Sequence, residues 1–271
     1  MKTFFIKPHL KLQRFVKYIQ VIEQTQCNGI NEPLQFYAEG YPGIIFLQTD
    51  QHVSLQNASS LSPFCVYGQT VKPLQMMPEG NFRMIVLGFY PHIIKPLFCF
   101  NSNEITDNCI DLRLTGNKGL SEVIDRFQHA VTLNEQVELI SNYLFDLYTA
   151  AKADPGKALT YAVTHIMESG GQTSLKNLRS YLQVPERTFE RRFEHYVGVG
   201  PKLFARICQF QSSLQQLQQR KFTKLSDIAY ENGFADQSHF IRAFSEFTGY
   251  APLEFLKRNN NQDIDPADYF S

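Results

Sequence analysis

The chain has 271 residues, of which 43% are hydrophobic and 19% are charged, and its formal net charge is zero. This composition excludes a disordered chain, and the length predicts one large domain or two ordinary ones. The five cysteines are scattered without a CxxC pair, which argues against a disulfide framework or a zinc knuckle and predicts a reducing, cytoplasmic location.

The apolar segments are too interrupted to enter a membrane. The first residues, MKTFFIKPHLKLQRF, are broken by Lys, His and Pro, unlike a signal peptide. The most apolar later stretch, RMIVLGFYPHIIKPLFCF, falls short of the roughly 18 uninterrupted apolar residues that a membrane span needs. We therefore expect no membrane partner.

Residues 1 to about 115 have the pattern of β structure. Short apolar runs such as GIIFLQT and FRMIVLGFY recur between Gly, Pro, Asn and Asp residues, which is typical of a small barrel or sandwich. One early helix is expected at His9–Ile22, because it carries apolar residues on one helical face: Leu12, Phe15, Val16 and Ile19.

Two helices are predicted next, at Lys118–His129 and Asn134–Ala151. The second carries an apolar stripe at spacings of 4, 3, 4 and 3, formed by Leu133, Val137, Ile140, Leu144 and Leu147. A stripe of two heptads either packs on its own domain or forms a dimer contact, and both remain open. The run KADPG at 152–156 breaks the helix and indicates a domain boundary.

The chain is predicted to be helical from residue 157 almost to residue 258. Helices are expected at 157–168, 174–181, 185–196, 201–219, 224–231, 236–246 and 252–257. The fold class is therefore α+β, with a β-rich, barrel-like domain at 1–152, an all-α domain at 157–258 and a polar tail at 259–271. Residues 155–258 contain 14 Lys and Arg against nine Asp and Glu, which is a weak indication of DNA binding.

The all-α region contains an internal repeat. Phe189, Phe193, Gly198, Pro201 and Phe204 are followed at the same spacings by Phe240, Phe244, Gly249, Pro252 and Phe255. Phe residues at i and i+4 share one helical face, Gly suits the left-handed end of a helix, and Pro suits the first turn of the next one. The repeat therefore predicts two copies of one helical unit.

A short helix and a tight turn precede each Phe pair. In the second copy, Ala229 allows two helices to cross closely, Gly233 can take a positive φ, and Phe234 fills the corner, which is a helix-turn-helix pattern. The first copy, SLKNLRSYLQVPERTFERRF, has a turn one residue shorter. A helix of about 20 residues, or roughly 30 Å, separates the copies and matches one turn of B-DNA, about 34–36 Å.

The stretch DIAYENGFADQSHFIRAFSEFTGYAPLEF resembles the signature of the AraC family of bacterial transcription regulators. The resemblance covers about Lys157 to Arg258 and implies two helix-turn-helix units joined by a linker helix. Recognition helices would lie near Pro185–Tyr196 and Asp236–Phe247. The matching base-facing positions are Arg187, Glu190 and Arg191 in the first helix and Gln237, Ser238 and Arg242 in the second. Their side chains suit base edges or phosphates.

For two further residues of these helices, the sequence leaves two possible roles each. Arg192 is either structural or a phosphate contact, and His239 either touches phosphate or packs locally. The first unit also departs from the family pattern, because Arg179 stands where Ala is usual and Gln183 stands where Gly is frequent. We expect the first recognition helix to be less well preorganised than the second.

The resemblance implies double-stranded promoter DNA as partner, with RNA polymerase, a small-molecule effector and a second copy of the chain as further candidates. The segment FRMIVLGFYPHIIKPLFCFNSNEITD, with the two helices after it, is similar to sensor-like domains attached to some family members. The cupin pattern of paired His, Glu and Gly is missing, so no cupin metal or activity is expected. Aromatic residues could line a pocket or fill the core: Phe36, Tyr41, Phe46, Tyr67, Phe82 and Phe89.

The sequence contains no enzyme fingerprint. The seven histidines show no HxH or HExxH grouping, and GxSxG, P-loop and dinucleotide motifs are missing, so we expect no catalytic residue, metal or cofactor. Cys65 and Cys99 are expected to be buried apolar residues. Two alternatives to an effector-controlled regulator stay open: a regulator whose N-terminal domain binds only a protein, and a DNA-recruited enzyme.

Overall fold

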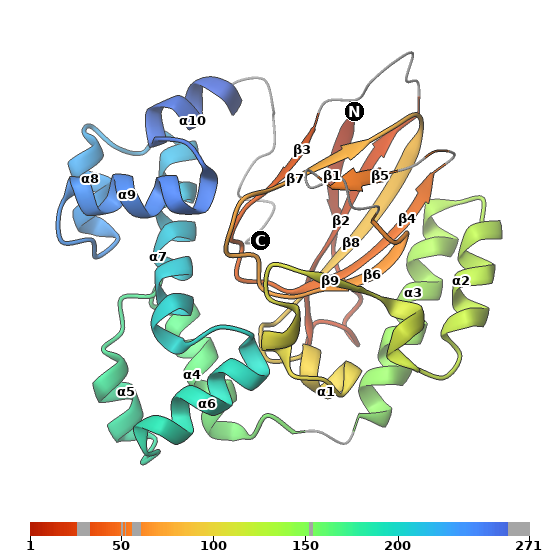
Figure 1. Ribbon diagram of the computed structural model, residues 1–271, viewed down its shortest axis with the longest axis horizontal. Coiled ribbons are helices and arrows are strands. Elements are labelled where there is room, and N and C mark those ends of the chain that lie inside the picture. Colours follow the sequence, from red (N-terminus) through yellow and green to blue (C-terminus); the bar gives the residue numbers. More distant parts are fainter. Residues whose placement is uncertain (26–32, 50, 52, 56–60, 152–153, 260–271) are drawn as a thin grey trace.

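A β-rich region and a helical region lie side by side in the computed structural model (Figure 1). The structure describes residues 1–25, 33–49, 51, 53–55, 61–151 and 154–259. Lys152 and Ala153 of the predicted boundary, and residues 260–271 of the predicted tail, lie outside these ranges. None of the helices in the described ranges is long and apolar enough to span a membrane.

The larger sheet has six antiparallel strands in the order β1-β2-β8-β4-β6-β9. The strands are β1 Lys2–Ile6, β2 Val16–Gln24, β4 Gly43–Thr49, β6 Phe64–Tyr67, β8 Phe82–Phe89 and β9 Cys109–Asp111. Both of its faces are buried, because Ile44 and Phe46 pack into one core while Ile45 and Leu47 pack into another. Two covered faces explain why the central strands are continuously apolar.

A smaller sheet of three strands covers one face of the larger sheet. Its order is β3-β7-β5, with β3 at Leu34–Phe36, β7 at Leu74–Pro78 and β5 at Val53–Leu55. Residues of both sheets share one hydrophobic core. The strand pairings of the described residues form two separate sheets rather than a closed barrel, so the arrangement is an open sandwich.

The prediction of a helix at His9–Ile22 is wrong. Residues 10–15 form a turn, and Val16–Gln24 is strand β2, the second strand of the sheet, between β1 and β8. The apolar pattern misled because both sides of β2 are buried: Tyr18 faces the small sheet and Ile19 faces the helices. A strand buried on both sides has no alternation to separate it from a helix.

Helices cover the other face of the large sheet. They are α1 Ile94–Phe98, the 3-10 turns η1 Ser102–Ile105 and η2 Leu112–Thr115, α2 Leu120–His129 and α3 Leu133–Ala150. The stripe of α3 packs into this core, with Ile140 and Leu144 fully buried and Tyr148 stacked on Phe15 at 4.3 Å between ring centroids. The stripe therefore packs on its own domain, which is the first of the two alternatives that the sequence left open.

Seven helices form the rest of the described chain, close to the predicted ranges. They are α4 Lys157–Glu168, α5 Leu175–Tyr181, α6 Glu186–Val197, α7 Pro201–Gln218, α8 Leu225–Glu231, α9 Gln237–Thr248 and α10 Pro252–Asn259. Helix α7 joins the pair α5–α6 to the pair α8–α9 (Figure 1). The predicted fold of two helix-turn-helix units and a linker helix is confirmed.

Candidate nucleic-acid interface and regulatory cavity

The repeated Phe residues build the same core in both helical units. Phe189 and Phe193 on α6 lie 5.6 Å apart between ring centroids, and Phe240 and Phe244 on α9 lie 5.7 Å apart. The third Phe of each copy closes the cluster, at 5.6 Å for Phe193–Phe204 and 5.4 Å for Phe244–Phe255. The two recognition helices are therefore anchored in equivalent ways on their inner faces.

Both recognition helices also end in the same way. Gly198 and Gly249 terminate α6 and α9 with φ values of 97° and 79°, and Pro201 and Pro252 begin the helices that follow. A residue with a side chain is strained in this left-handed conformation, so glycine suits these two ends.

The second corner is tight. Ala229 on α8 is fully buried against α9, Gly233 has φ 75°, and the Phe234 amide donates to the Ala229 carbonyl at 2.9 Å. Phe234 is buried and contacts Phe240 with 5.4 Å between ring centroids. The small residue and the left-handed residue thus have the geometry that the sequence indicated.

The first corner is built from different residues. Gln183 takes the left-handed turn position with φ 53°, where the second unit has Gly233. Arg179 extends from α5 to Glu186, the first residue of α6, with 2.5 Å between guanidinium nitrogen and carboxylate oxygen. An ion pair therefore joins the two helices at this corner, whereas the second corner relies on close contact at Ala229.

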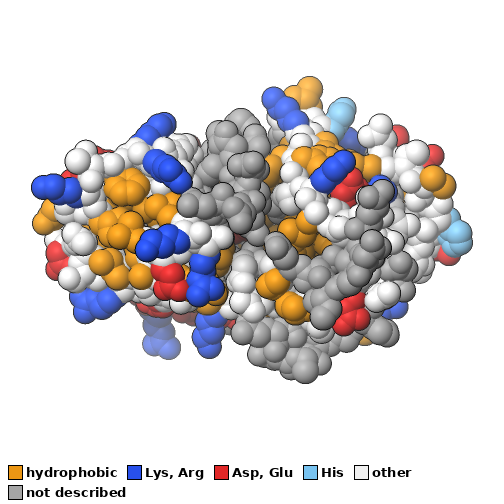
Figure 2. Space-filling view, turned by 90° about the horizontal axis from the view of Figure 1, so that it is seen from above, with side chains coloured by type: hydrophobic (Ala, Val, Ile, Leu, Met, Phe, Trp, Pro, Cys, Tyr) orange, Lys and Arg blue, Asp and Glu red, His pale blue; other side chains and the backbone are white. Residues whose placement is uncertain are grey.

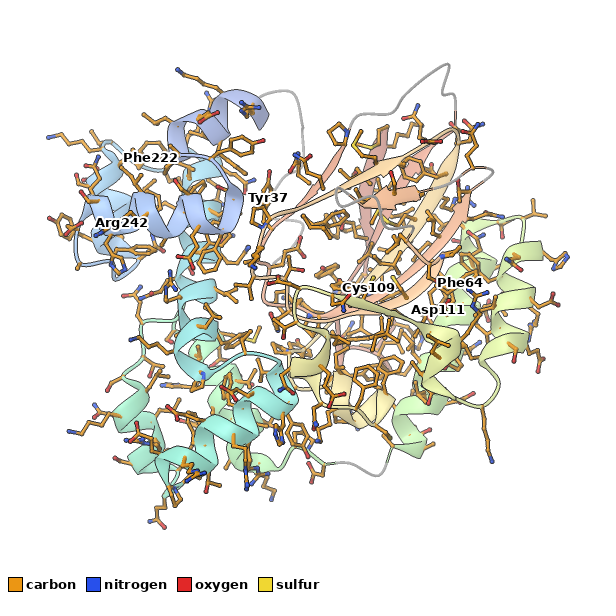
Figure 3. All side chains as sticks on the ribbon, in the orientation of Figure 1. Tyr37, Phe64, Cys109, Asp111, Phe222 and Arg242 are labelled. Carbon is orange, nitrogen blue, oxygen red and sulfur yellow. The ribbon has the colours of Figure 1, made fainter. Side chains whose placement is uncertain are left out.

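The predicted base-facing side chains all point away from the Phe cores. They are exposed in both helices: Arg187, Glu190 and Arg191 on α6, and Gln237, Ser238 and Arg242 on α9. The three α6 side chains form no hydrogen bond or ion pair with other described residues. Arg242 lies at the outer edge of the molecule (Figure 3). Asp236 caps α9 by accepting the His239 amide at 2.7 Å, which fixes the end that bears Gln237.

Arg192 and His239, whose roles the sequence left undecided, both contact other residues of the protein. The Arg192 guanidinium donates to the Pro155 carbonyl at 2.9 Å, at the start of the helical region. His239 is half-buried and lies edge-on to Phe234, with 5.5 Å between ring centroids. Arg192 thus has a structural contact, and His239 packs at the corner of its own unit.

Helix α7 sets the distance between the two units. Its 18 residues span roughly 27 Å at 1.5 Å per residue. Phe204 joins the core of the first unit, and Phe210 lies 5.4 Å from Phe244 of the second unit. Lys and Arg side chains lie around the end of the molecule formed by α8–α10, at the left of Figure 2. The arrangement presents two exposed helices on a shared support.

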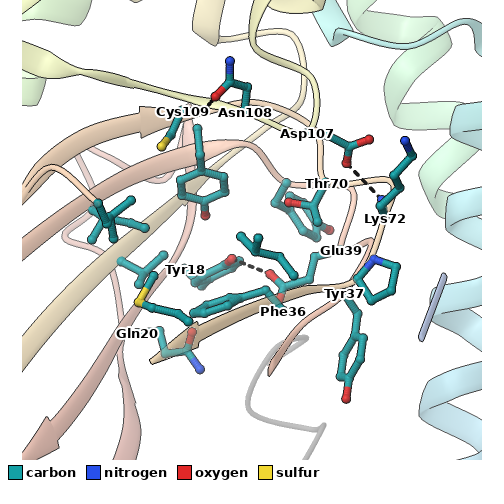
Figure 4. A pocket seen from close by; sticks show the side chains of 18 residues that line it. Tyr18, Gln20, Phe36, Tyr37, Glu39, Thr70, Lys72, Asp107, Asn108 and Cys109 are labelled. Carbon is teal, nitrogen blue, oxygen red and sulfur yellow. Dashed lines mark hydrogen bonds between the residues drawn. The ribbon is translucent and has the colours of Figure 1, made fainter. Parts of the chain in front are cut away.

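A cavity of about 350 Å³ lies between the two sheets of the N-terminal region (Figure 4). Of the aromatic residues considered from sequence, Phe36, Tyr41 and Tyr67 line it. The others, Phe46, Phe82 and Phe89, are buried in the two cores. Sequence reasoning missed two polar lining residues, Glu39 and Tyr18, because no motif distinguishes either of them.

Residues 37–40, here called the coupling segment, join the cavity to the helical region. Tyr37 meets Phe255 of α10 edge-on at 5.3 Å between ring centroids, and it lies beside these helices in Figure 3. The Ala38 carbonyl accepts from Gln211 of α7 at 2.7 Å. Glu39 lines the cavity, and a methyl group added to Gly40 would contact Ile207 of α7 at 3.5 Å. The coupling segment as a whole thus lines the cavity and contacts the helical region.

A second contact joins the first recognition helix to the N-terminal region. The Ser102 hydroxyl of η1 donates to the Tyr196 carbonyl at 2.8 Å, and the Thr106 hydroxyl donates to the Gly198 carbonyl at 2.6 Å. Lys95 of α1 lies over the Tyr196 ring at 5.3 Å. The C-terminal end of α6 is therefore held by the domain that contains the cavity.

Two thiols lie beside each other, and one of them lines the cavity. Cys65 on β6 is buried and hydrogen bonds to Cys109 on β9, which lines the cavity. This hydrogen bond lowers the pKa of the Cys109 thiol to about 7, although burial opposes the shift. The expectation that Cys99 is buried is wrong: it is exposed at the left-handed end of α1. Within the described ranges, no group of three or more His, Cys, Asp or Glu is placed to hold a metal.

Two family models match the sequence. Residues 178–258 match a helix-turn-helix domain, and residues 5–111 match a domain of unknown function. No curated protein matches.

Solved structures with a similar arrangement include ToxT from Vibrio cholerae, at 13% identity, 88% coverage of this chain, 97% of that chain and TM-score 0.48. ToxT bound to (E)-4-(8-methylnaphthalen-1-yl)but-3-enoic acid gives 15% identity, the same coverages and TM-score 0.47. The AraC-like activator CuxR gives 10% identity, coverages of 74% and 82%, and TM-score 0.26.

Proposed function

We propose that the chain is an AraC-type transcription regulator that reads a specific promoter sequence with α6 and α9 in two adjacent major grooves, and the helix-turn-helix match over residues 178–258 supports this. The observation that carries this proposal is the repeated Phe framework, because it holds two exposed helices in equivalent poses on α7. Promoter DNA is the proposed partner of residues 157–258, and residues 1–152 are the proposed regulatory domain.

Each exposed side chain has a proposed role in reading DNA. Arg187, Arg191 and Arg242 are suited to guanine or phosphate, Gln237 to adenine, and Glu190 to cytosine. Ser238 suits a base edge or a phosphate. Arg192 and His239 are proposed to support the helices, with phosphate contact as a secondary role, because both already contact protein.

The N-terminal cavity is the proposed effector site. Its volume of about 350 Å³ lies in the range of small-molecule pockets, roughly 300–1,000 Å³. The coupling segment supports this proposal, since Glu39 lines the cavity while Tyr37 and Ala38 contact α10 and α7. A ligand that moves Glu39 would therefore change the support of both recognition helices. RNA polymerase and a second copy of the chain are further proposed partners.

Binding of promoter DNA at several salt concentrations tests the DNA-reading function. Specific binding should weaken as salt rises, because Lys and Arg contacts to phosphate release counterions. The protein should also bind its promoter site more tightly than it binds a scrambled duplex of the same length. Salt-independent affinity, or equal affinity for both duplexes, would contradict the proposal.

Mass spectrometry of the purified chain tests the effector site separately. A small molecule that co-purifies with the wild type and is lost when the cavity is filled supports a metabolite sensor. Ile45→Trp is the preferred filling variant, because Ile45 lines the cavity wall. Ala38 is not a suitable position, because it is fully buried beside α7. A protein that co-purifies in place of a small molecule would favour the alternative in which this domain binds only a protein.

A further inference from the structure

Glu39 is a half-buried residue whose carboxyl group lines the cavity. Its Oε2 accepts the Tyr18 hydroxyl at 2.7 Å (Figure 4). None of the ion pairs in the described part of the chain includes Glu39, and its other carboxylate oxygen accepts no hydrogen bond there. Burial raises the pKa of Glu39, although the Tyr18 hydrogen bond opposes this shift. A half-buried carboxylate without a neighbouring cation loses part of its hydration, so it marks a place that a cation would stabilise.

Aromatic rings line the same cavity as this carboxyl group. Tyr18 and Tyr41 meet edge-on with 6.0 Å between ring centroids, and Phe36 and Tyr67 line the same cavity. The faces of Tyr and Phe rings carry negative potential and attract ammonium groups, most strongly where water is excluded. Rings around a carboxylate are a combination that recognises organic cations.

The other charged lining residues do not favour an anion. Lys72 is exposed at the edge of the cavity, and its ammonium points away from Glu39 in Figure 4. Asp107 accepts the backbone amides of Val71 and Lys72 at 2.6 and 2.9 Å. The charge that faces the interior is therefore that of Glu39, which would repel a carboxylate ligand.

We propose that the cavity binds a small organic cation, with an ammonium group against Glu39 and the surrounding rings and an apolar body between the two sheets. This inference rests on the proposed effector role of the cavity and names the ligand class. The apolar walls, which include Ile45, Leu61, Leu74 and Met76, contact the uncharged part of the ligand.

Ligand charge and pH are coupled in this site. A quaternary ammonium ion keeps its charge at every pH, so its affinity reports the ionisation of the protein. The titratable groups near Glu39 are Tyr18 and Tyr41, whose pKa values are raised mainly by burial, and Lys72, Asp107 and Cys109 also line the cavity. Because the pKa of Glu39 is raised, affinity for the cation increases as the pH rises through it and the carboxylate forms.

Calorimetric titration with benzyltrimethylammonium tests the proposal on the full chain. Its uncharged isostere, 2,2-dimethylpropylbenzene, and the acid 4-phenylbutanoate are the comparison probes. The wild type should bind the cation roughly tenfold or more tightly than either probe, and Glu39→Gln should remove that preference. The matched control is Glu79→Gln, an exposed residue at the end of the same small sheet, which should keep the preference.

The affinity of the wild type for benzyltrimethylammonium is also measured across pH. This measurement tests the proposal even where the Glu39→Gln variant does not fold. Affinity for the cation should rise with pH below the titration of Cys109, whose pKa is about 7, and Glu39→Gln, where it folds by circular dichroism, should flatten this part of the profile. Tighter binding of the isostere or of the acid, or a flat profile in the wild type, would overturn the proposal. Cation binding that depends on Glu39 but leaves promoter affinity unchanged would uphold the ligand class and refute only the effector role.

Discussion

The two helix-turn-helix units share one framework and differ at their corners. Phe193–Phe204 in the first and Phe244–Phe255 in the second are equivalent contacts. The second corner is made by Ala229 and Gly233, whereas the first has Arg179 and Gln183. The Phe spacing is common to both units and accounts for their shared fold, whereas the local contacts between the paired helices differ at the corners.

The units also differ in their contacts with the N-terminal region. The first recognition helix ends on Ser102 and Thr106 through two hydrogen bonds to its last carbonyls. The second unit reaches that region through Phe255, which meets Tyr37 of the coupling segment. The first recognition helix thus contacts the N-terminal region directly, and the second unit contacts it through α10.

Truncating the shared framework should have the largest effect. Phe193→Ala and Phe244→Ala each remove a fully buried ring and should lower the free energy of unfolding by about 3–5 kcal/mol. Chemical denaturation monitored by circular dichroism measures both. A loss under about 1 kcal/mol in one unit only would contradict the equivalence of the two cores.

Removing one Arg from each recognition helix should weaken DNA binding without unfolding the protein. Arg191→Ala and Arg242→Ala should each cost about 1–3 kcal/mol of binding free energy if each reads a base. Fluorescence anisotropy with selected and single-base-changed duplexes measures the loss and its position. Lys202→Ala on α7, an exposed side chain outside both recognition helices, is the control. An unchanged affinity in either Arg variant would remove that helix from the proposed interface.

Substituting the left-handed residue of each corner should change the free energy of unfolding differently in the two units. Gly233→Ala should destabilise by about 1 kcal/mol, because φ is 75° and the added methyl would lie 3.0 Å from the Gln172 side chain. Gln183→Gly should be neutral or stabilise by up to about 1 kcal/mol, because it relieves a strained φ of 53°. Thermal unfolding compares them, with Gly116→Ala as a left-handed control that has open space around it. Equal changes in stability for Gly233→Ala and Gln183→Gly would contradict the proposed difference between the two corners.

Breaking the ion pair of the first corner should have the smallest effect. Arg179→Ala loses the contact with Glu186, whose side chain is 68% exposed, so the stability change should stay below about 1 kcal/mol and shrink at high salt. Denaturation at low and high salt measures it. A larger, salt-independent loss would mean that the stem of Arg179 packs the corner.

The regular features of this molecule were the predictable ones. Fixed Phe, Gly and Pro spacings predicted the repeated helices, since those positions depend only on helical periodicity, whereas the base-facing residues were matched through the family resemblance. The sequence did not reveal strand β2, because burial on both faces removes its alternation. It could not reveal Glu39 either, because Tyr18 approaches it from a strand that is distant in the sequence.

Hydroxyl-radical and methylation footprinting of the full chain on a site selected from random duplexes tests the central claim most directly. Two reading helices on one rigid support predict two protected major-groove segments on one DNA face, about one helical turn or 10–10.5 base pairs apart. Arg191→Ala should remove one segment and Arg242→Ala the other. A single protected segment, or two lost together in either variant, would contradict the account.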